Sequence, residues 1–385
     1  MQFLSETLQQ IEKAGLKRSL RLLTPLGATR ALHNGREVVL FCTNNYLGLT
    51  HHPRVLARVQ EALQAYGTGS GAARLISGHT PLYQALEEAV ARFKGCPRAL
   101  VFPSGYTVNI AVISALAGRE DVLFCDRLCH ASLLDGCLLS GARLVRFRHN
   151  DPDSLRRLLT LHPGRRRFLV TEGVFSMDGD SAPLMELYEL AEKNTLIFIV
   201  DDAHGTGVLG PGGRGTLAAQ GVPAEKLVLT GTLSKALGSL GGFVAGSALL
   251  IEYILNCARP FIFTTALPPA SIAAALAALE VLEEEPALVD RLWQNVDRLH
   301  AGLAALGYTV PKTSAIIPLI LGPPERAADA SERLLMHGYY VPAVRPPAVP
   351  AGTARLRITV SAAHTAAEID GFLEALKDVL GQAVT

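Results

Sequence analysis

The most informative stretch of the sequence is LVLTGTLSKALGSLGGFVAG, residues 227–246. Two short apolar runs, residues 227–229 and 242–245, predict buried strands on either side of a turn rich in glycine and hydroxyl side chains. Lys235 stands in that turn. An amine placed there is partly desolvated, which lowers its pKa and favours the neutral form that acts as a nucleophile. Lys235 is therefore a candidate catalytic nucleophile, although a surface lysine in a glycine-rich hairpin would give the same local pattern.

Apolar runs of the same kind recur upstream and alternate with helical patterns. The runs fall at residues 99–102, 122–125, 144–147, 168–171 and 196–200. Residues 80–94 carry apolar side chains at helical spacing, with Thr80 as an expected cap and Pro81 in the first turn. Strands that alternate with helices predict an α/β architecture with a mainly parallel central sheet.

The pattern changes after about residue 275. Helices are expected at residues 288–306, 327–337 and 366–380, and strands at residues 315–320 and 355–360. We therefore expect an N-terminal segment (1–45), a large domain (46–275) and a smaller α+β C-terminal domain (276–385).

The composition excludes several classes of protein. With 36 basic and 35 acidic residues, the formal charge of +1 gives no global field that attracts nucleic acid or an anionic membrane. Pro268 and Pro269 interrupt the alanine-rich run 266–282, so no span of membrane length is expected, and the N-terminus lacks the apolar core of a secretory signal. The six cysteines form no CxxC pair, which favours buried thiols, no metal site and a cytoplasmic location.

A second polar segment follows the run at residues 196–200. Asp201 ends the predicted strand and His204 lies in the turn after it. Open α/β sheets bind ligands at the carboxyl ends of their parallel strands. A carboxylate there can pair with a protonated pyridine nitrogen, and an imidazole can donate to a ring oxygen. The alternative is that Asp201 or Asp202 merely caps the turn.

Three further segments offer complementary groups. The backbone amides of Gly105 and Tyr106 open a predicted helix, which is a ready phosphate site, and the hydroxyl of Thr232 can also reach a phosphate. His130 follows the run at 122–125 and can stack on a flat ring, while Ser176 offers a hydroxyl donor. An ordinary βα turn, a solvated histidine and a polar turn are the respective alternatives.

Five motifs in order carry a family resemblance: NNYLGL (44–49), GSGAARLISG (69–78), TEGVFSMDGD (171–180), VDDAHGTGVLG (200–210) and TLSKALG (232–238). From about residue 15 to the C-terminus the sequence resembles the α-oxoamine synthases. The resemblance implies pyridoxal 5′-phosphate as cofactor and the aspartate-aminotransferase-like fold (fold type I). Residues 343–358 are most similar to the members that condense L-alanine with pimeloyl-CoA or a pimeloyl-carrier protein in biotin biosynthesis.

The resemblance also implies roles in holding the cofactor. Lys235 forms an imine with it and later moves the substrate Cα proton, and Asp201 pairs with the pyridine nitrogen. His130 stacks on the cofactor ring, and His204 and Ser176 contact the oxygen of that ring. The phosphate is held by Gly105, Tyr106 and Thr232, and by Thr264 of a second subunit. A homodimer with a shared active site is therefore implied.

Substrate contacts follow from the same resemblance. Arg345 pairs with the carboxylate of the amino acid, since a guanidinium matches a carboxylate with two hydrogen bonds. Asn44 and Arg18 line the substrate site, with Lys17 or Arg21 as alternatives to Arg18. Ala348 departs from the family, which often has a hydroxyl residue after the Pro-Pro pair.

Three other functions fit parts of the pattern. One is another α-oxoamine synthase that uses glycine or serine, such as glycine C-acetyltransferase. A second is a non-catalytic protein with a decayed cofactor site, which is disfavoured because a competent side chain fills every polar role. A third is a dinucleotide-binding enzyme, but Gly205-Thr-Gly207 lacks the further spacing of that fingerprint.

Overall fold

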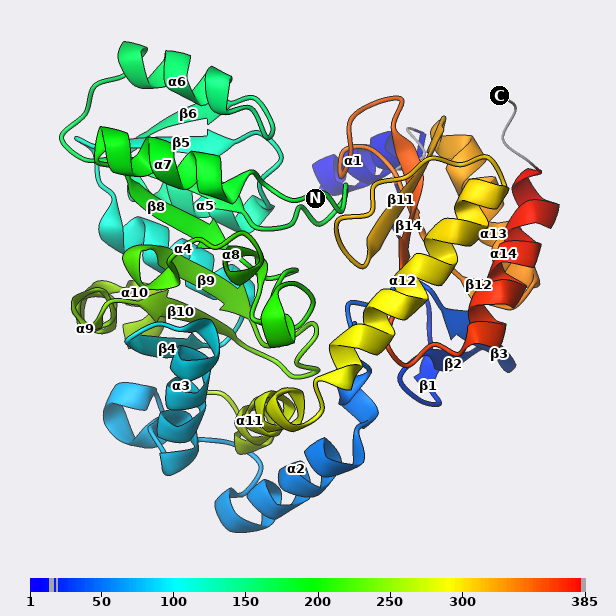
Figure 1. The fold of residues 1–385 in the computed structure, drawn as a ribbon, viewed down its shortest axis with the longest axis horizontal. Helices are drawn as coiled ribbons and strands as arrows, with labels where there is room; N and C mark the ends of the chain where they lie inside the picture. Colours follow the sequence, from blue (N-terminus) through cyan, green and yellow to red (C-terminus); the bar gives the residue numbers. More distant parts are fainter. Residues whose placement is uncertain (14–16, 19, 382–385) are drawn as a thin grey trace. The chain divides into compact units, whose positions relative to one another are not determined.

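A seven-stranded sheet runs through the larger of two units into which the chain divides (Figure 1). The computed structural model describes residues 1–13, 17, 18 and 20–381. The larger unit comprises Asn44–Trp293 and Thr313–Ala315, and the smaller one comprises Met1–Thr43, Gln294–Lys312 and Ile316–Thr385. The predicted boundaries at residues 45 and 275 remain a prediction.

The order of the strands across the large sheet differs from their order in the sequence. It runs β4 (Arg98–Phe102), β10 (Gly242–Gly246), β9 (Val228–Thr232), β8 (Ile197–Asp201), β7 (Arg167–Glu172), β5 (Val122–Asp126) and β6 (Arg143–Phe147). β10 is antiparallel to both of its neighbours, and the other adjacent pairs are parallel. The expectation of a mainly parallel central sheet is confirmed.

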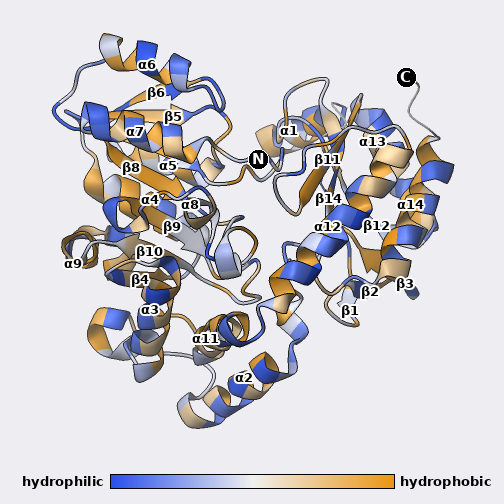
Figure 2. Cartoon of the chain, viewed as in Figure 1, coloured by the Kyte–Doolittle hydropathy of each residue, from blue (hydrophilic) through white to orange (hydrophobic). Residues whose placement is uncertain are grey.

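Helices connect the parallel strands, as a parallel sheet requires. The helices of this unit include α2 (Pro53–Tyr66), α3 (Pro81–Lys94), α4 (Gly105–Leu116), α5 (Ala131–Ser140), α6 (Pro152–Leu161), α7 (Leu184–Asn194), α8 (Thr216–Ala219), α9 (Ala248–Cys257), α10 (Arg259–Ile262) and α11 (Pro269–Glu284). All residues of β5, β9 and β10 are buried. Figure 2 shows hydrophobic residues along β5 and β8 and a polar face on α6, which is the pattern of a sheet covered by helices.

The smaller unit contains two sheets. One has the order β1 (Thr24–Pro25), β2 (Arg30–His33), β3 (Arg36–Leu40) and β12 (Tyr339–Tyr340), and the other has the order β11 (Ile316–Gly322), β14 (Ala354–Thr359) and β13 (Ala343–Val344). Its helices include α1 (Gln2–Lys13), α13 (Pro324–Met336) and α14 (Ala366–Leu380), and α12 (Ala287–Ala305) continues into it from the larger unit. Thr365 and Glu368 form a capping box that begins α14.

Two local predictions were wrong. Thr80 does precede α3, but its hydroxyl makes no capping hydrogen bond and is buried without a partner in the described part of the chain. The helix begins there because Pro81 fixes the backbone angle of the first turn. All six cysteines are free thiols, yet Cys257 is exposed, because it ends α9 at the surface.

No helix in residues 1–13, 17, 18 and 20–381 has the length and apolarity needed to cross a bilayer.

Candidate active site

Lys235 and His204 meet at the carboxyl ends of β9 and β8. Nζ of the half-buried Lys235 lies 3.0 Å from Nε2 of His204. Nδ1 of His204 in turn lies 2.8 Å from the hydroxyl of Tyr46, and that hydroxyl donates to Oδ1 of Asn44 at 3.2 Å. A single chain of polar contacts therefore joins three predicted site residues, with Tyr46 as a link that the sequence analysis missed.

The two turns approach closely because Gly207 lies between them. Its φ of 77° is in the left-handed region that favours glycine. A Cβ atom at this position would lie 2.5 Å from Cβ of Ala236, the residue after Lys235. The turn that carries His204 can thus pack directly against the turn that carries the lysine.

Asp201 is the last residue of β8 and is only 7% exposed. Its Oδ1 accepts a hydrogen bond from the backbone amide of Ala203 at 2.9 Å, and its Oδ2 accepts one from the side-chain amide of Asn109 at 2.7 Å. One carboxylate oxygen therefore stabilises the turn, as the capping alternative supposed, while the other belongs to a network of side chains.

Asp202 has a different set of partners. Its Oδ2 lies 2.8 Å from Nζ of Lys94, and both side chains are 1% exposed. Its Oδ1 accepts from the hydroxyl and the backbone amide of Thr216 at 2.6 Å and 3.1 Å. Because these groups anchor Asp202 beneath the turn, the adjacent Asp201 is fixed at the end of the sheet.

His130 is the N-cap of α5. Its Nδ1 accepts from the backbone amide of Ser132 at 3.3 Å and lies 2.8 Å from the Ser132 hydroxyl. Burial lowers the pKa of His130 against the opposing influence of Asp201, and the charge of Lys235 lowers it further. Its surroundings therefore favour the neutral form of the imidazole.

The start of α4 lies against Thr232. Ser104 caps this helix by accepting from the backbone amide of Thr107 at 3.0 Å, and Gly105 is its first residue. A Cβ atom on Gly105 would lie 3.1 Å from Cβ of Thr232, so the glycine and the threonine form one wall. The free amides of a helix N-terminus beside a hydroxyl suit a phosphate group.

Tyr106 contributes its backbone to this wall. Its hydroxyl donates to Asp135, which raises the pKa of the phenol, and its ring meets the His130 ring edge-on at 6.1 Å. The side chain is therefore held against α5. The backbone amide of Tyr106 remains the group predicted to bind a phosphate.

Ser176 lies half-buried in the loop after β7, and an ion-pair cluster anchors that loop. His149 lies between two carboxylates, with Nδ1 3.0 Å from Asp126 and Nε2 2.8 Å from Asp180. Burial alone would lower the pKa of His149, but the hydrogen bonds to Asp126 and Asp180 raise it to about 10. The imidazolium thus ties the Ser176 loop to the end of β5.

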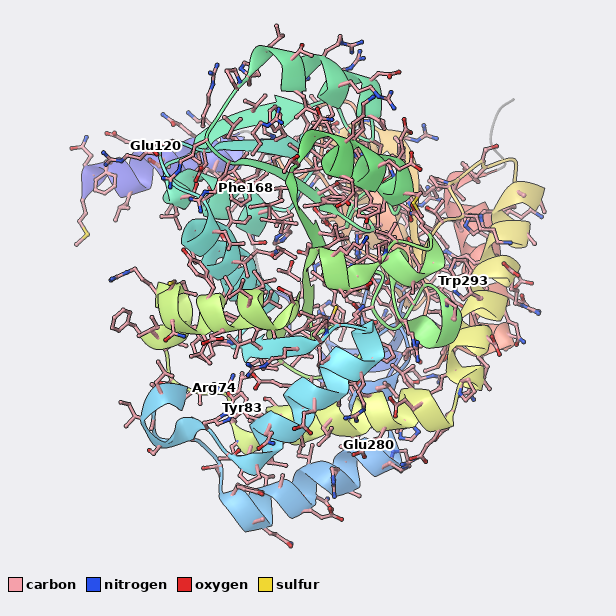
Figure 3. All side chains as sticks on the ribbon, turned by 60° about the vertical axis from the view of Figure 1, so that its left-hand side comes forward. Arg74, Tyr83, Glu120, Phe168, Glu280 and Trp293 are labelled. Carbon is pink, nitrogen blue, oxygen red and sulfur yellow. The ribbon has the colours of Figure 1, made fainter. Side chains whose placement is uncertain are left out.

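Thr264 follows α10 in a segment held by the loop at residues 69–78. A β-bridge joins Ala73 to Thr265, and the hydroxyl of Ser70 donates to the carbonyl of Ala266 at 2.8 Å. Within the same loop Arg74 is buried. Its guanidinium forms two hydrogen bonds with Glu87 and stacks over Tyr83 at 4.0 Å, beside which it lies in Figure 3. This cluster gives the Thr264 segment a fixed support.

A cleft of about 530 Å³ in the smaller unit is lined by the predicted substrate-binding cations. Lys17, Arg18, Arg21 and Arg345 all line it. Arg21 pairs with Glu332 across the cleft, and Lys17 pairs with Glu12 at 2.7 Å. The three alternatives for the N-terminal cation therefore share one surface with Arg345.

Four residues of the larger unit were missed by the sequence analysis: Tyr46, Asn109, Ser132 and Glu172. Glu172 ends β7 opposite Asp201, and its side chain accepts a hydrogen bond from the backbone amide of His130. Burial raises the pKa of Glu172 well above its ordinary value, and the charge of Asp201 adds to this effect. Position at a strand end was the available signal for Glu172, whereas Asn109 sits inside a helix and gives no local signal.

The profile of the family described as aminotransferase class I and II matches residues 36–376. The chain belongs to the aminotransferase class I and II family. This family assignment agrees with the sheet topology and with a lysine, an aspartate and a helix N-terminus converging at one edge of the sheet. The predicted fold is confirmed.

Individual curated proteins and solved structures are also similar to this chain. A putative 8-amino-7-oxononanoate synthase of Desulforudis audaxviator is 74% identical over 99% of this chain and 100% of its own length. An 8-amino-7-oxononanoate synthase of Anaeromyxobacter dehalogenans is 48% identical over 99% of this chain and 96% of its own length. A solved structure of serine palmitoyltransferase from S. paucimobilis with bound PLP–myriocin has a TM-score of 0.92 and 36% identity, covering 98% and 96%. The predicted resemblance and pyridoxal-phosphate dependence are confirmed.

The residues present fit that cofactor. The buried carboxylate of Asp201 can hold a proton on a pyridine nitrogen, and the amine of Lys235 can bond to an aldehyde. Gly105 allows a phosphate to approach the amides at the start of α4, beside the hydroxyl of Thr232.

Proposed function

We propose that this enzyme joins L-alanine to a pimeloyl thioester, expels the thiol and carbon dioxide, and forms 8-amino-7-oxononanoate for biotin biosynthesis. Two relatives that match almost the whole chain carry the name of this activity. The observation that carries the proposal within the molecule is the convergence of Lys235, His204 and Asp201 at the carboxyl edge of the sheet.

Each side chain has a distinct task in this reaction. When bound, pyridoxal phosphate supplies an electron sink for the pair left at Cα of the amino acid. Asp201 keeps the ring nitrogen protonated, and the amine of Lys235 accepts the Cα proton and later returns one. His130 covers the ring face, while His204 and Ser176 donate to the ring oxygen.

The phosphate and the substrate are held by other groups. Gly105 and Tyr106 offer backbone amides and Thr232 a hydroxyl to the phosphate. Arg345 forms a two-point ion pair with the carboxylate of L-alanine, and Asn44 and Arg18 line the substrate site.

We further propose a homodimer in which Thr264 reaches the phosphate of the neighbouring subunit. Large apolar side chains are exposed on the two segments around Thr264: Leu75 by 50%, Ile76 by 81% and Phe263 by 72%. Contiguous exposed apolar residues of this kind mark an interaction surface. Phe263→Asp should therefore yield monomers with weakened cofactor binding in sedimentation and titration experiments, whereas Leu161→Asp on α6, with 67% exposure, should remain dimeric. A dimeric Phe263→Asp protein would contradict the proposed interface.

A cytoplasmic location is also part of the proposal. Free thiols on all six cysteines support it, because they are typical of a reducing compartment.

A substrate panel tests the function. The purified enzyme, loaded with pyridoxal phosphate, receives L-alanine, glycine or L-serine together with pimeloyl-CoA, pimeloyl-carrier protein, acetyl-CoA or palmitoyl-CoA. Thiol release and the mass of the product are measured. L-alanine with a pimeloyl donor should give the highest kcat/KM. A higher value for glycine with acetyl-CoA would overturn the proposal.

Serine palmitoyltransferase activity is the second candidate, because solved structures of that enzyme superimpose on almost the whole chain. The L-serine and palmitoyl-CoA arm of the panel distinguishes it.

A further inference from the structure

Asn109 lies in the second turn of α4 and is 2% exposed. Its side-chain nitrogen lies 2.7 Å from Oδ2 of Asp201 and 2.9 Å from Oγ of Ser132. Its side-chain oxygen lies 2.7 Å from Oγ1 of Thr230. One buried amide therefore uses both of its hydrogens and its oxygen to join side chains from β8, α5 and β9.

The direction of each hydrogen bond in this network follows from Asp201. An ionised carboxylate accepts hydrogen bonds and donates none, so the amide must turn its NH₂ group toward Asp201. Thr230 then donates to the amide oxygen. The second amide hydrogen goes to Oγ of Ser132, which leaves the Ser132 hydroxyl hydrogen available for another acceptor.

That acceptor is Nδ1 of His130, which lies 2.8 Å from Oγ of Ser132. The backbone amide of Ser132 points at the same nitrogen from 3.3 Å. A ring nitrogen that accepts from two donors carries no hydrogen, so the single proton of the neutral imidazole is on Nε2. The N-terminus of α5 also disfavours an imidazolium at this place.

We propose that Asn109 is a positioning residue that couples Asp201 to His130 and fixes the Nε2–H tautomer of the imidazole. The inference rests on the proposed function only in taking these two side chains as the ones that meet the cofactor ring. Loss of the Asn109 amide frees the Ser132 hydroxyl to turn elsewhere, so His130 can place its proton on Nδ1. The same loss leaves Oδ2 of Asp201 without its amide donor.

The test reads the ring nitrogens of His130 directly. The full-length protein is labelled with [¹⁵N]histidine, and long-range ¹H–¹⁵N spectra are recorded with and without pyridoxal phosphate. The resonances absent from His130→Gln assign the residue. Wild-type protein should show an unprotonated Nδ1. In Asn109→Ala the Nδ1–H population and the dissociation constant of pyridoxal phosphate should each rise about tenfold, the factor expected for one lost hydrogen bond to a charged or strongly polar group.

Two variants separate coupling from general damage. Asn295 also donates through its side-chain amide to two acceptors, the carbonyls of Ser361 and His364 in the smaller unit, so Asn295→Ala should leave the His130 spectrum unchanged. Ser132→Ala keeps the bond between Asn109 and Asp201, and it should shift the His130 tautomer while affecting cofactor affinity less than Asn109→Ala does. If Asn109→Ala does not fold, the Ser132→Ala spectrum decides.

A protonated Nδ1 in the wild-type protein, or an unchanged tautomer in Asn109→Ala or Ser132→Ala, would overturn the inference. Because these spectra do not depend on turnover, they remain interpretable if the enzyme turns out to use a different amino acid or acyl donor.

Discussion

Nζ of Lys235 lies 3.0 Å from Nε2 of His204, although the two residues are 31 positions apart in the chain. The contact exists because β8 and β9 are adjacent and parallel, so that the turns after both strands emerge at the same edge of the sheet. An amine in hydrogen-bond contact with an imidazole can exchange a proton with it. In the proposed reaction this pair lies at the chemical centre of the larger unit.

Removal of the Lys235 amine should abolish catalysis. In the proposed mechanism Lys235→Ala removes both the bond to the cofactor and the group that moves the Cα proton, so kcat should fall by about 10³-fold or more. Borohydride treatment of the holoenzyme should label wild-type protein at Lys235 and leave the variant unlabelled, as read by peptide mass. Lys193→Ala, at an exposed position of α7, is the matched control and should retain both properties. Undiminished turnover in Lys235→Ala would refute the assigned role.

A side chain at Gly242 should disrupt the wall formed by Gly105 and Thr232, which is proposed to bind the phosphate. A Cβ atom there would lie 2.5 Å from the carbonyl oxygen of Ser104 and 2.7 Å from the amide nitrogen of Gly105, and backbone atoms cannot move aside easily. Gly242→Ala should therefore weaken pyridoxal phosphate binding by about tenfold or more, as measured by fluorescence titration. Gly27→Ala has open space around its Cβ and should bind normally. Equal affinities of the two variants would show that the wall tolerates displacement.

Breaking the buried ion pair between Lys94 and Asp202 should destabilise the folded protein. Lys94→Met leaves the carboxylate of Asp202 buried without its ammonium partner, which should cost about 3–5 kcal/mol in the free energy of unfolding. Lys94→Met combined with Asp202→Asn removes the stranded charge and should recover part of that loss in urea unfolding experiments. The single variant Asp202→Asn is measured as well. If adding Asp202→Asn to Lys94→Met lowers the free energy of unfolding as much as it does in the wild type, the two residues act independently.

The clamp of His149 between two carboxylates predicts a pH dependence. Its folded-state pKa of about 10 lies above the ordinary value of about 6.5, so the stabilisation is complete below pH 6.5 and declines as the pH rises toward 10. The free energy of unfolding should thus decrease between these values in the wild type and change less in His149→Gln. The variant should also be less stable by about 2 kcal/mol at pH 7. Parallel pH profiles of the two proteins would contradict a charged His149.

Much of the architecture could be predicted from the sequence because short apolar runs that alternate with amphipathic helices have few other ways to bury their surface. The run at residues 122–125 became β5 with one further residue, and the helix predicted at residues 366–380 has those bounds in the structure. The cap at Thr80 failed, since a suitable residue type at a helix start does not ensure that its hydroxyl turns toward the backbone.

The residue types alone were enough to predict the groups that the proposed chemistry uses: a lysine in a glycine-rich turn, a carboxylate at a strand end and a helix start suited to a phosphate. These are local features, so the residue types within each segment are sufficient to predict them. The tertiary structure alone decided how these groups are connected. Asn109 touches Asp201 across 92 positions of sequence, and Tyr46 touches His204 across 158. Such contacts depend on which strands become neighbours in the sheet, because hydrogen bonds form at distances near 3 Å in space whatever the separation along the chain.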